Sequence, residues 1–233
     1  MGIRGVLSNL RDVAKGISLR HLAQTTPSGE SLVCQDLRPP TVCHVSIRNP
    51  TFYSLLLHID QDFAEQARAQ RCRCGGALHS ARYPRKPRGL SDEVRSHFDF
   101  RYSFCCADCR CRTTPCSVRF LGRRVYVAAI MVMVSATRAS AGTAAAMRQL
   151  DSLGVPPSTI ARWRHWWTTR FVSTPFWTLE QAMFVPPVVT ARLPASLLER
   201  FVSAPGAEPL LRLLRWLSPL TSGSAVSSLR EGR

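Results

Sequence analysis

Two groups of cysteines, separated by an arginine-rich stretch, constrain this chain more than any other feature of its sequence. The first is Cys72-Arg-Cys74-Gly-Gly and the second is Cys105-Cys106-Ala-Asp-Cys109-Arg-Cys111. A tetrahedral zinc site needs four thiolate or imidazole donors, which two tight turns can supply. Glycines after the first pair let the backbone fold around a metal. The pattern predicts one structural Zn²⁺ in a small zinc-ribbon β element, held by Cys72, Cys74, Cys106 and Cys109.

The cysteine pattern leaves alternatives open. The first pair is CxC rather than CxxC, and the two groups lie further apart than is usual for a ribbon. Cys105 or Cys111 could replace one of the four proposed ligands. Cys34, Cys43 and His44 could be further ligands, but they stand apart from the two groups, which makes this a weaker prediction. The cysteines could instead be free thiols of a reduced fold. A redox pair at Cys72 and Cys74 is disfavoured because no thioredoxin-like βαβ pattern surrounds it. Nine cysteines without a signal-peptide pattern argue against a disulfide scaffold.

The charge of the chain indicates a partner rich in phosphate. The formal net charge is +16, and residues 71–124 hold 13 basic against 4 acidic residues. Such a local excess is typical of nucleic-acid-binding surfaces. Pro84 and Pro87 exclude a helix over residues 81–89, so we expect an extended loop that contacts the DNA backbone or minor groove. Its candidate binding residues are Arg82, Arg85, Lys86 and Arg88. The alternative is a solvated linker.

The pattern around the cysteines predicts a helix and a strand. Apolar residues recur at helical spacing over 53–70, and aromatic residues alternate with polar ones over 98–104, which favours a half-buried strand. An apolar run then fills a helix over 125–139 that is too short to span a membrane. Helices over 144–153 and from 158 to about 171 follow. Helix, break, helix, glycine turn and helix is the order of a helix-turn-helix module.

The last helix of that unit has a buried and an outward-facing side. Ile160, Trp163, Trp167 and Phe171 form the expected buried stripe. The outward side is expected to hold Thr159, Arg162, His165 and Trp166. By position we expect Thr159 and Arg162 to reach base edges and Arg164 or His165 to reach phosphate, with Arg123 and Arg124 as further contacts.

The expected fold class is mainly α with a small zinc-ribbon β element and a three-helix helix-turn-helix unit. Further apolar helices at 193–201 and 209–217 are expected to pack on that unit or to form a homodimer surface. The expected domains are a poorly ordered extension (1–50), a helix with a zinc-ribbon-like domain (51–122), the helix-turn-helix (123–171), C-terminal helices (172–220) and a disordered tail (221–233).

The sequence gives no sign of a catalytic site. A two-metal nuclease core needs an acidic triad on an α/β scaffold, and the few acids after Asp108 fall on helical or tail segments. No phosphate loop, Ser-His-Asp set or HExxH is present. A thiol nucleophile at Cys116 with His97 or His165 has no pattern that brings the residues together. We therefore expect no enzyme activity.

The chain holds five longer motifs: C-x-C-G-G-x-L-H at 72–79, Y-P-R-K-P-R-G at 83–89, S-F-C-C at 103–106, P-x-S-V-R-F-L-G-R-R-V-Y at 115–126 and L-P-A-S-L-L-E-R-F at 193–201. They resemble those of mobile-element-associated bacterial proteins that have no assigned function. The resemblance covers roughly residues 53–220, and it implies a protein similar to the zinc-ribbon and helix-turn-helix part of insertion-sequence transposases. It does not imply transposase activity, because the catalytic half is missing.

Together these patterns predict a DNA-binding protein of the cytoplasm, associated with the nucleoid, without chemistry or a membrane segment of its own. Its partners would be duplex DNA and a catalytic transposase chain. Three alternatives remain at this point: an RNA-binding zinc-ribbon protein, a fragment or subunit that acts with a catalytic partner, and a degenerate reading frame of a mobile element.

Overall fold

The computed structural model describes residues 49–121, 125–139, 153–202 and 209–222, all of which belong to one compact unit. Most of the expected extension, the expected helix over 144–153 and the candidate residues Arg123 and Arg124 lie outside the described residues. Within the described ranges, no helix has both the length and the apolar character needed to cross a membrane.

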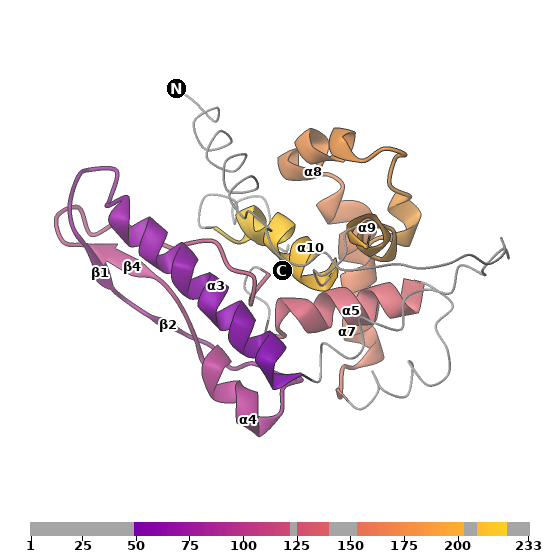
Figure 1. The fold of residues 1–233 in the computed structure, drawn as a ribbon, viewed down its shortest axis with the longest axis horizontal. Helices are drawn as coiled ribbons and strands as arrows, with labels where there is room; N and C mark the ends of the chain where they lie inside the picture. Colours follow the sequence, from indigo (N-terminus) through magenta and orange to yellow (C-terminus); the bar gives the residue numbers. More distant parts are fainter. Residues whose placement is uncertain (1–48, 122–124, 140–152, 203–208, 223–233) are drawn as a thin grey trace, which may run out of the picture. The chain divides into compact units, whose positions relative to one another are not determined.

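The described part of the chain is mainly helical with a small antiparallel sheet (Figure 1). Its first half contains α3 (Pro50–Ala69), β1 (Leu78–Ser80), β2 (Tyr83–Pro84), α4 (Asp92–Arg95), η1 (Ser96–Phe98), β3 (Phe100–Arg101), β4 (Phe104–Cys106) and β5 (Arg112–Thr113). Its second half contains α5 (Ala128–Ala139), α7 (Pro157–His165), the π-helix η2 (Trp166–Phe171), α8 (Pro175–Glu180), η3 (Gln181–Met183), η4 (Thr190–Arg192), α9 (Ala195–Phe201), α10 (Pro209–Leu217) and η5 (Ser218–Thr221).

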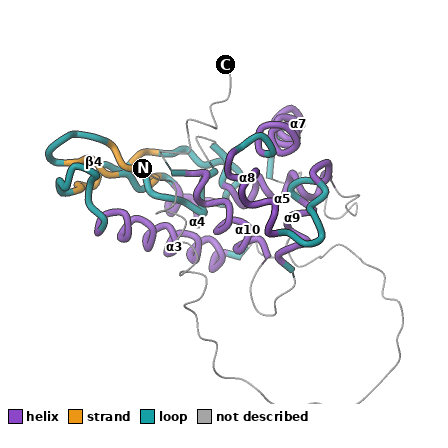
Figure 2. The backbone as a smooth tube through the Cα atoms, turned by 90° about the horizontal axis from the view of Figure 1, so that it is seen from above, coloured by secondary structure: helices purple, strands orange, loops and turns teal. Residues whose placement is uncertain are grey.

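Helix α3 is the long helix predicted ahead of the first cysteines. The side chain of Asn49 caps it by accepting a hydrogen bond from the Thr51 amide at 2.9 Å, and Pro50 fits the first helical position. Leu56 and Ile59 are buried, as their spacing predicted. The strands lie beside the C-terminal end of the helix (Figure 2).

Two antiparallel segments form a ribbon that connects the cysteines to the basic loop. In the three-stranded sheet β1-β4-β5, Leu78 pairs with Cys106 and Cys105 pairs with Arg112. The chain continues into the pair β2–β3, and the Ala81 amide donates to the Ser103 carbonyl at 2.8 Å between the two. The prediction that residues 81–89 are not helical is confirmed.

The prediction of one half-buried strand over 98–104 is wrong in two respects. Phe98 lies in the short helix η1, and Arg101 and Ser103 are buried although the alternation placed them on the polar side. Arg101 tolerates burial because its guanidinium donates to the carbonyls of Pro115 and Thr221. Burial lowers the pKa of Arg101 to about 10. The guanidinium still donates hydrogen bonds to both of these carbonyls.

The helical half forms the main core. Helix α5 is buried on all sides over residues 128–134 and packs against α7, α9 and α10. Leu210, Leu213, Leu214 and Leu217 form the expected buried stripe of α10. Thr221 corrects the predicted start of the disordered tail, because it is buried and donates to the Ser218 carbonyl at 2.6 Å.

Helix α7 continues into η2, and the buried stripe through residues 160, 163, 167 and 171 is confirmed. Two residues predicted to face outward are buried instead. Trp166 packs its ring 4.8 Å from that of Trp167, because the wider turn of the π-helix brings it to the inner face. Thr159 is also buried, and its hydroxyl accepts a hydrogen bond from Arg162 at 3.2 Å.

Candidate metal centre

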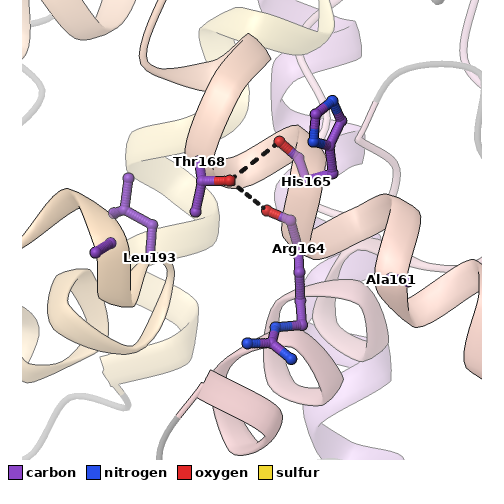
Figure 3. A pocket seen from close by; sticks show the side chains of 6 residues that line it. Ala161, Arg164, His165, Thr168 and Leu193 are labelled. Atoms are coloured by element: carbon purple, nitrogen blue, oxygen red, sulfur yellow. Dashed lines mark hydrogen bonds between the residues drawn. The ribbon is translucent and has the colours of Figure 1, made fainter.

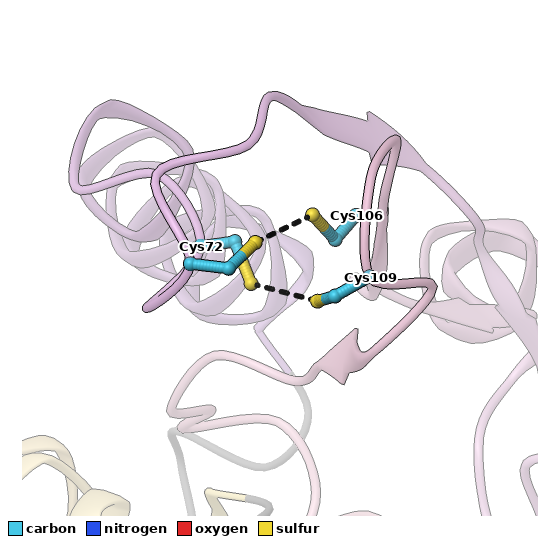
Figure 4. A group of neighbouring side chains, drawn as sticks. Cys72, Cys106 and Cys109 are labelled. Carbon is cyan, nitrogen blue, oxygen red and sulfur yellow. Dashed lines mark hydrogen bonds between the residues drawn. The ribbon is translucent and has the colours of Figure 1, made fainter.

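Four cysteine side chains from two turns converge at the end of the ribbon. Cys72 and Cys74 lie in the turn between α3 and β1, whereas Cys106 ends β4 and Cys109 lies in the turn before β5. Figure 4 shows the labelled sulfurs of Cys72, Cys106 and Cys109 directed toward one another. These are the four residues that the sequence singled out as the ligand set.

The sulfur atoms have the spacing of a metal site. Cys72 Sγ lies 3.5 Å from Cys109 Sγ, Cys74 Sγ lies 3.4 Å from Cys106 Sγ, and all four sulfurs lie within 4.8 Å of one another. A tetrahedron with metal–sulfur bonds of about 2.3 Å has edges of about 3.8 Å. A disulfide bond is only about 2.05 Å long. The cluster therefore consists of free thiols close enough to hold one metal ion.

Backbone hydrogen bonds close the first turn. The Gly75 amide donates to the Cys72 carbonyl at 2.8 Å, and the Cys72 amide donates to the Gly76 carbonyl at 3.1 Å. Gly75 has a φ of +88°, which favours glycine. A Cβ on Gly76 would lie 2.5 Å from Asp108 Oδ2 and 2.6 Å from Cys106 Sγ. Both glycines are thus required for the turn and for its approach to the second group.

The second turn depends on an arginine in a left-handed conformation. Arg110 has a φ of 60°, a region that costs a residue with a side chain roughly 1–2 kcal/mol. The Cys106 amide donates to the Cys111 carbonyl at 3.0 Å, and the Ala107 amide donates to the Ala77 carbonyl at 2.9 Å. These bonds tie the second turn to itself and to the first, so that Cys106 and Cys109 face the first pair.

The thiols of the cluster differ in pKa. The backbone amide of Gly76, followed by the three other thiols, lowers the pKa of Cys74 to about 7. At Cys109 a backbone hydrogen bond from Cys111 lowers the pKa, but its contacts with neighbouring thiols outweigh this and raise the pKa overall. Four adjacent thiolates repel one another, so full ionisation of the cluster requires a cation among them.

The other cysteines of the described ranges lie outside the four-sulfur cluster. Cys105 directs its thiol to the Arg110 carbonyl at 3.5 Å, and Cys111 is exposed. Cys116 is half-buried, and burial raises the pKa of its thiol. The competition for the ligand set is resolved geometrically, since neither Cys105 nor Cys111 belongs to the group. Cys34, Cys43 and His44 lie outside the described residues.

The basic residues proposed from the sequence differ in how exposed they are to solvent. In the loop, Arg82, Lys86 and Arg88 are exposed, whereas Arg85 is half-buried with its guanidinium 5.0 Å from the centre of the Phe120 ring. On α7, Arg162, Arg164 and His165 are exposed, and Thr159 is not available to reach a base.

Sequence reasoning missed four further exposed arginines beside the cysteines. They are Arg71, Arg73, Arg110 and Arg112. The excess of charge over residues 71–124 contained the signal, but nothing in the sequence separated them from buried arginines such as Arg119. The two cysteine turns thus carry exposed positive charge as well as thiols.

A shallow hollow lies beside the exposed end of α7. It has a volume of about 250 Å³ and is lined by Ala161, Arg164, His165, Thr168, Ala191 and Leu193. Figure 3 shows Thr168 turned back onto the backbone, where its hydroxyl donates to the carbonyls of Arg164 and His165 at 3.1 and 3.3 Å. Arg164 and His165 line the hollow and are exposed.

No protein-family model, curated protein or solved structure matches this chain. What the chain does is therefore inferred from its cysteine cluster and its charged surfaces.

Proposed function

We propose that this protein binds duplex DNA through a zinc-ribbon-like β element and a helix-turn-helix unit, in the manner of the DNA-binding part of an insertion-sequence transposase. The observation that carries the proposal is the convergence of four thiols at one end of an antiparallel ribbon that presents exposed cations along its length. Each part of the proposal has its own structural support.

Zinc is the metal that best suits the cluster. Four soft thiolates at tetrahedral spacing favour Zn²⁺, which has no redox chemistry and is closed off by four ligands in structural sites. Among the described residues, those buried in the core beneath the cluster are Ala64, Leu78, Phe104 and Cys106. So small a core leaves little free energy to hold the sheet together, which a bound metal would supply.

The basic loop is suited to contact phosphates. Pairing of β2 with β3 and a hydrogen bond of 2.6 Å from the Arg85 amide to the Asp99 carbonyl fix its backbone. Arg82, Lys86 and Arg88 are exposed on that fixed backbone, and the Arg82 guanidinium lies over the Phe100 ring. Cations on a rigid frame lose less conformational freedom on binding a phosphate backbone than cations on a flexible chain.

Helix α7 would provide the second DNA contact. It packs against α5 and keeps Arg162, Arg164 and His165 exposed. This is the arrangement that a recognition helix needs, with phosphate contacts from the basic side. The burial of Thr159 moves the proposed base contact to Arg162. The middle helix of the unit lies outside the described residues.

The protein would act without chemistry of its own, and a catalytic transposase chain remains the proposed protein partner. The rival of an RNA-binding ribbon protein shares the cluster and the cations. Competition of structured RNA against duplex DNA at equal salt separates the two, since affinities for nucleic acid can be compared only at one salt concentration.

Salt dependence of binding tests the proposal. We expect affinity for a duplex to fall steeply between 50 and 200 mM salt, with a slope of about −0.9 in log–log form for each phosphate neutralised. The triple variant Arg82→Ala, Lys86→Ala and Arg88→Ala should make the slope shallower by about 2.7. Arg215→Ala, at an exposed position on α10, should leave it unchanged. Binding that is insensitive to salt, or a triple variant with the wild-type slope, would contradict the proposal.

A further inference from the structure

One aromatic side chain of the basic loop stands apart from every other aromatic in the described ranges. Tyr83 is 46% exposed, whereas the remaining phenylalanines, tyrosines and tryptophans of those ranges are buried or half-buried. The fold thus covers these other rings at least partly and leaves the Tyr83 ring in solvent. An exposed ring in the middle of a run of cations is the composition of a nucleic-acid-stacking surface.

The backbone holds Tyr83 in place on both sides. Its Cα pairs with that of Arg101, which is buried, and the neighbouring residue Pro84 pairs with Phe100. Hydrogen bonds from the amides of Ala81 and Arg85 tie down the residues just outside the strand. The ring therefore projects from a fixed strand, and ordering it on binding costs little entropy.

Two arginines flank Tyr83 in the sequence, and each guanidinium lies against an aromatic ring. The Arg85 guanidinium lies 5.7 Å from the centre of the Tyr83 ring, and that of Arg82 lies 4.4 Å from the centre of the Phe100 ring. Residues 83 and 85 point to the same side of an extended strand. A cation next to the ring attracts a phosphate to the position where the attached base can stack on the tyrosine.

We propose that Tyr83 is a stacking platform for an unpaired base, so that the loop prefers nucleic acid with unpaired nucleotides over a continuous duplex. The face of a base is open only when it is not stacked between neighbours. In a duplex the ring would have to enter between base pairs, which costs a few kcal/mol of stacking. This inference rests on the proposed nucleic-acid-binding function and specifies which form of the polymer the loop takes.

The test compares three probes of one sequence: a single strand, a continuous duplex, and that duplex with an unpaired tail. We expect the wild type to bind the tailed duplex more tightly than the continuous one. Tyr83→Ala should weaken binding to the tailed duplex and to the single strand by about 5- to 150-fold, the range measured for one stacked base. Its affinity for the continuous duplex should change less than twofold.

Two variants separate stacking from charge and from folding. Tyr83→Phe keeps the ring and should keep the preference, whereas Lys86→Ala removes a cation and should weaken binding to all three probes alike. Circular dichroism should show the same spectrum for Tyr83→Ala and wild type, because the side chain is largely exposed. Equal loss on all probes for Tyr83→Ala, or no loss on any, overturns the stacking platform but leaves DNA binding standing. Absence of wild-type binding to every probe at low salt overturns both.

Discussion

Gly76 occupies the most restricted position of the cysteine cluster. A Cβ there would lie 2.5 Å from Asp108 Oδ2 and 2.6 Å from Cys106 Sγ, well inside van der Waals contact. Cys106 is buried at the end of a paired strand and has little room to give way. We expect Gly76→Ala to weaken metal binding by about tenfold or more, a cost comparable to losing a group that supports the ligands. Competition with a chromophoric chelator measures this affinity.

Two further variants show whether the effect is local. Adding Asp108→Ala to Gly76→Ala removes the nearer contact and should recover part of the lost affinity. Gly154→Ala places the same substitution at a glycine outside the sheet, where a φ of +62° strains the backbone but no atom meets the new Cβ, and it should leave metal affinity unchanged. Wild-type affinity in Gly76→Ala would mean that the two cysteine turns do not approach each other as described.

At the residue scale, the sequence predicted the members of the cluster better than the surroundings of single charged side chains. The spacing of the CxC and CxxC motifs, with the glycines after the first pair, indicated which four sulfurs lie close together. Asp60 gave no comparable signal, because an acid on a helix has an ordinary interpretation as a surface charge. Its role depends on Arg119, which the chain brings to it only in the folded state.

At the scale of elements, a buried ion pair joins α3 to the segment that follows the sheet. Asp60 accepts hydrogen bonds from the Ser117 hydroxyl and the Val118 amide, both at 2.6 Å, and from Arg119 Nε at 2.8 Å. Arg119 is fully buried, donates to the His97 carbonyl, and lies over four aromatic rings. The pair thus fixes the helix that leads into the first cysteine turn.

Removing the charge of Asp60 should therefore destabilise the fold. We expect Asp60→Asn to lower the free energy of unfolding by about 3–5 kcal/mol, because it leaves the Arg119 charge buried without its partner. Asp62→Asn changes an exposed acid on the same helix and should alter stability by less than about 0.5 kcal/mol. Urea denaturation followed by circular dichroism measures both. A loss below about 1 kcal/mol in Asp60→Asn would show that the pair does not hold the elements together.

Helices of strong amphipathic pattern were predictable, whereas the short strands were not. The buried stripes of α10 and α3 follow directly from apolar spacing, although α3 begins at Pro50, ahead of the expected start at residue 53. The segment 98–104 has an equally regular alternation, yet tertiary contacts to Arg101 override it and break the strand. Likewise, nothing in the sequence signals that α7 ends in a π-helix, which turned Trp166 inward.

At the scale of the whole molecule, the described residues have two separate cores of very different size. The large one involves α3, α5, α7, α9 and α10, while the one beneath the cysteine cluster holds only four buried residues. We expect a metal to stabilise mainly the small sheet. Chelation should leave most of the helical circular dichroism intact and expose the turns around residues 72–76 and 106–111 to proteolysis.

Metal content of the purified protein, with single serine substitutions, tests the central claim most directly. We expect about one Zn²⁺ per chain, as one tetrahedral site requires. Substitution of Cys72, Cys74, Cys106 or Cys109 should abolish it. The same substitution at Cys105, Cys111 or Cys116 should retain the metal, because these thiols lie outside the cluster. A folded protein without metal, or equal loss in both sets of variants, would contradict the account.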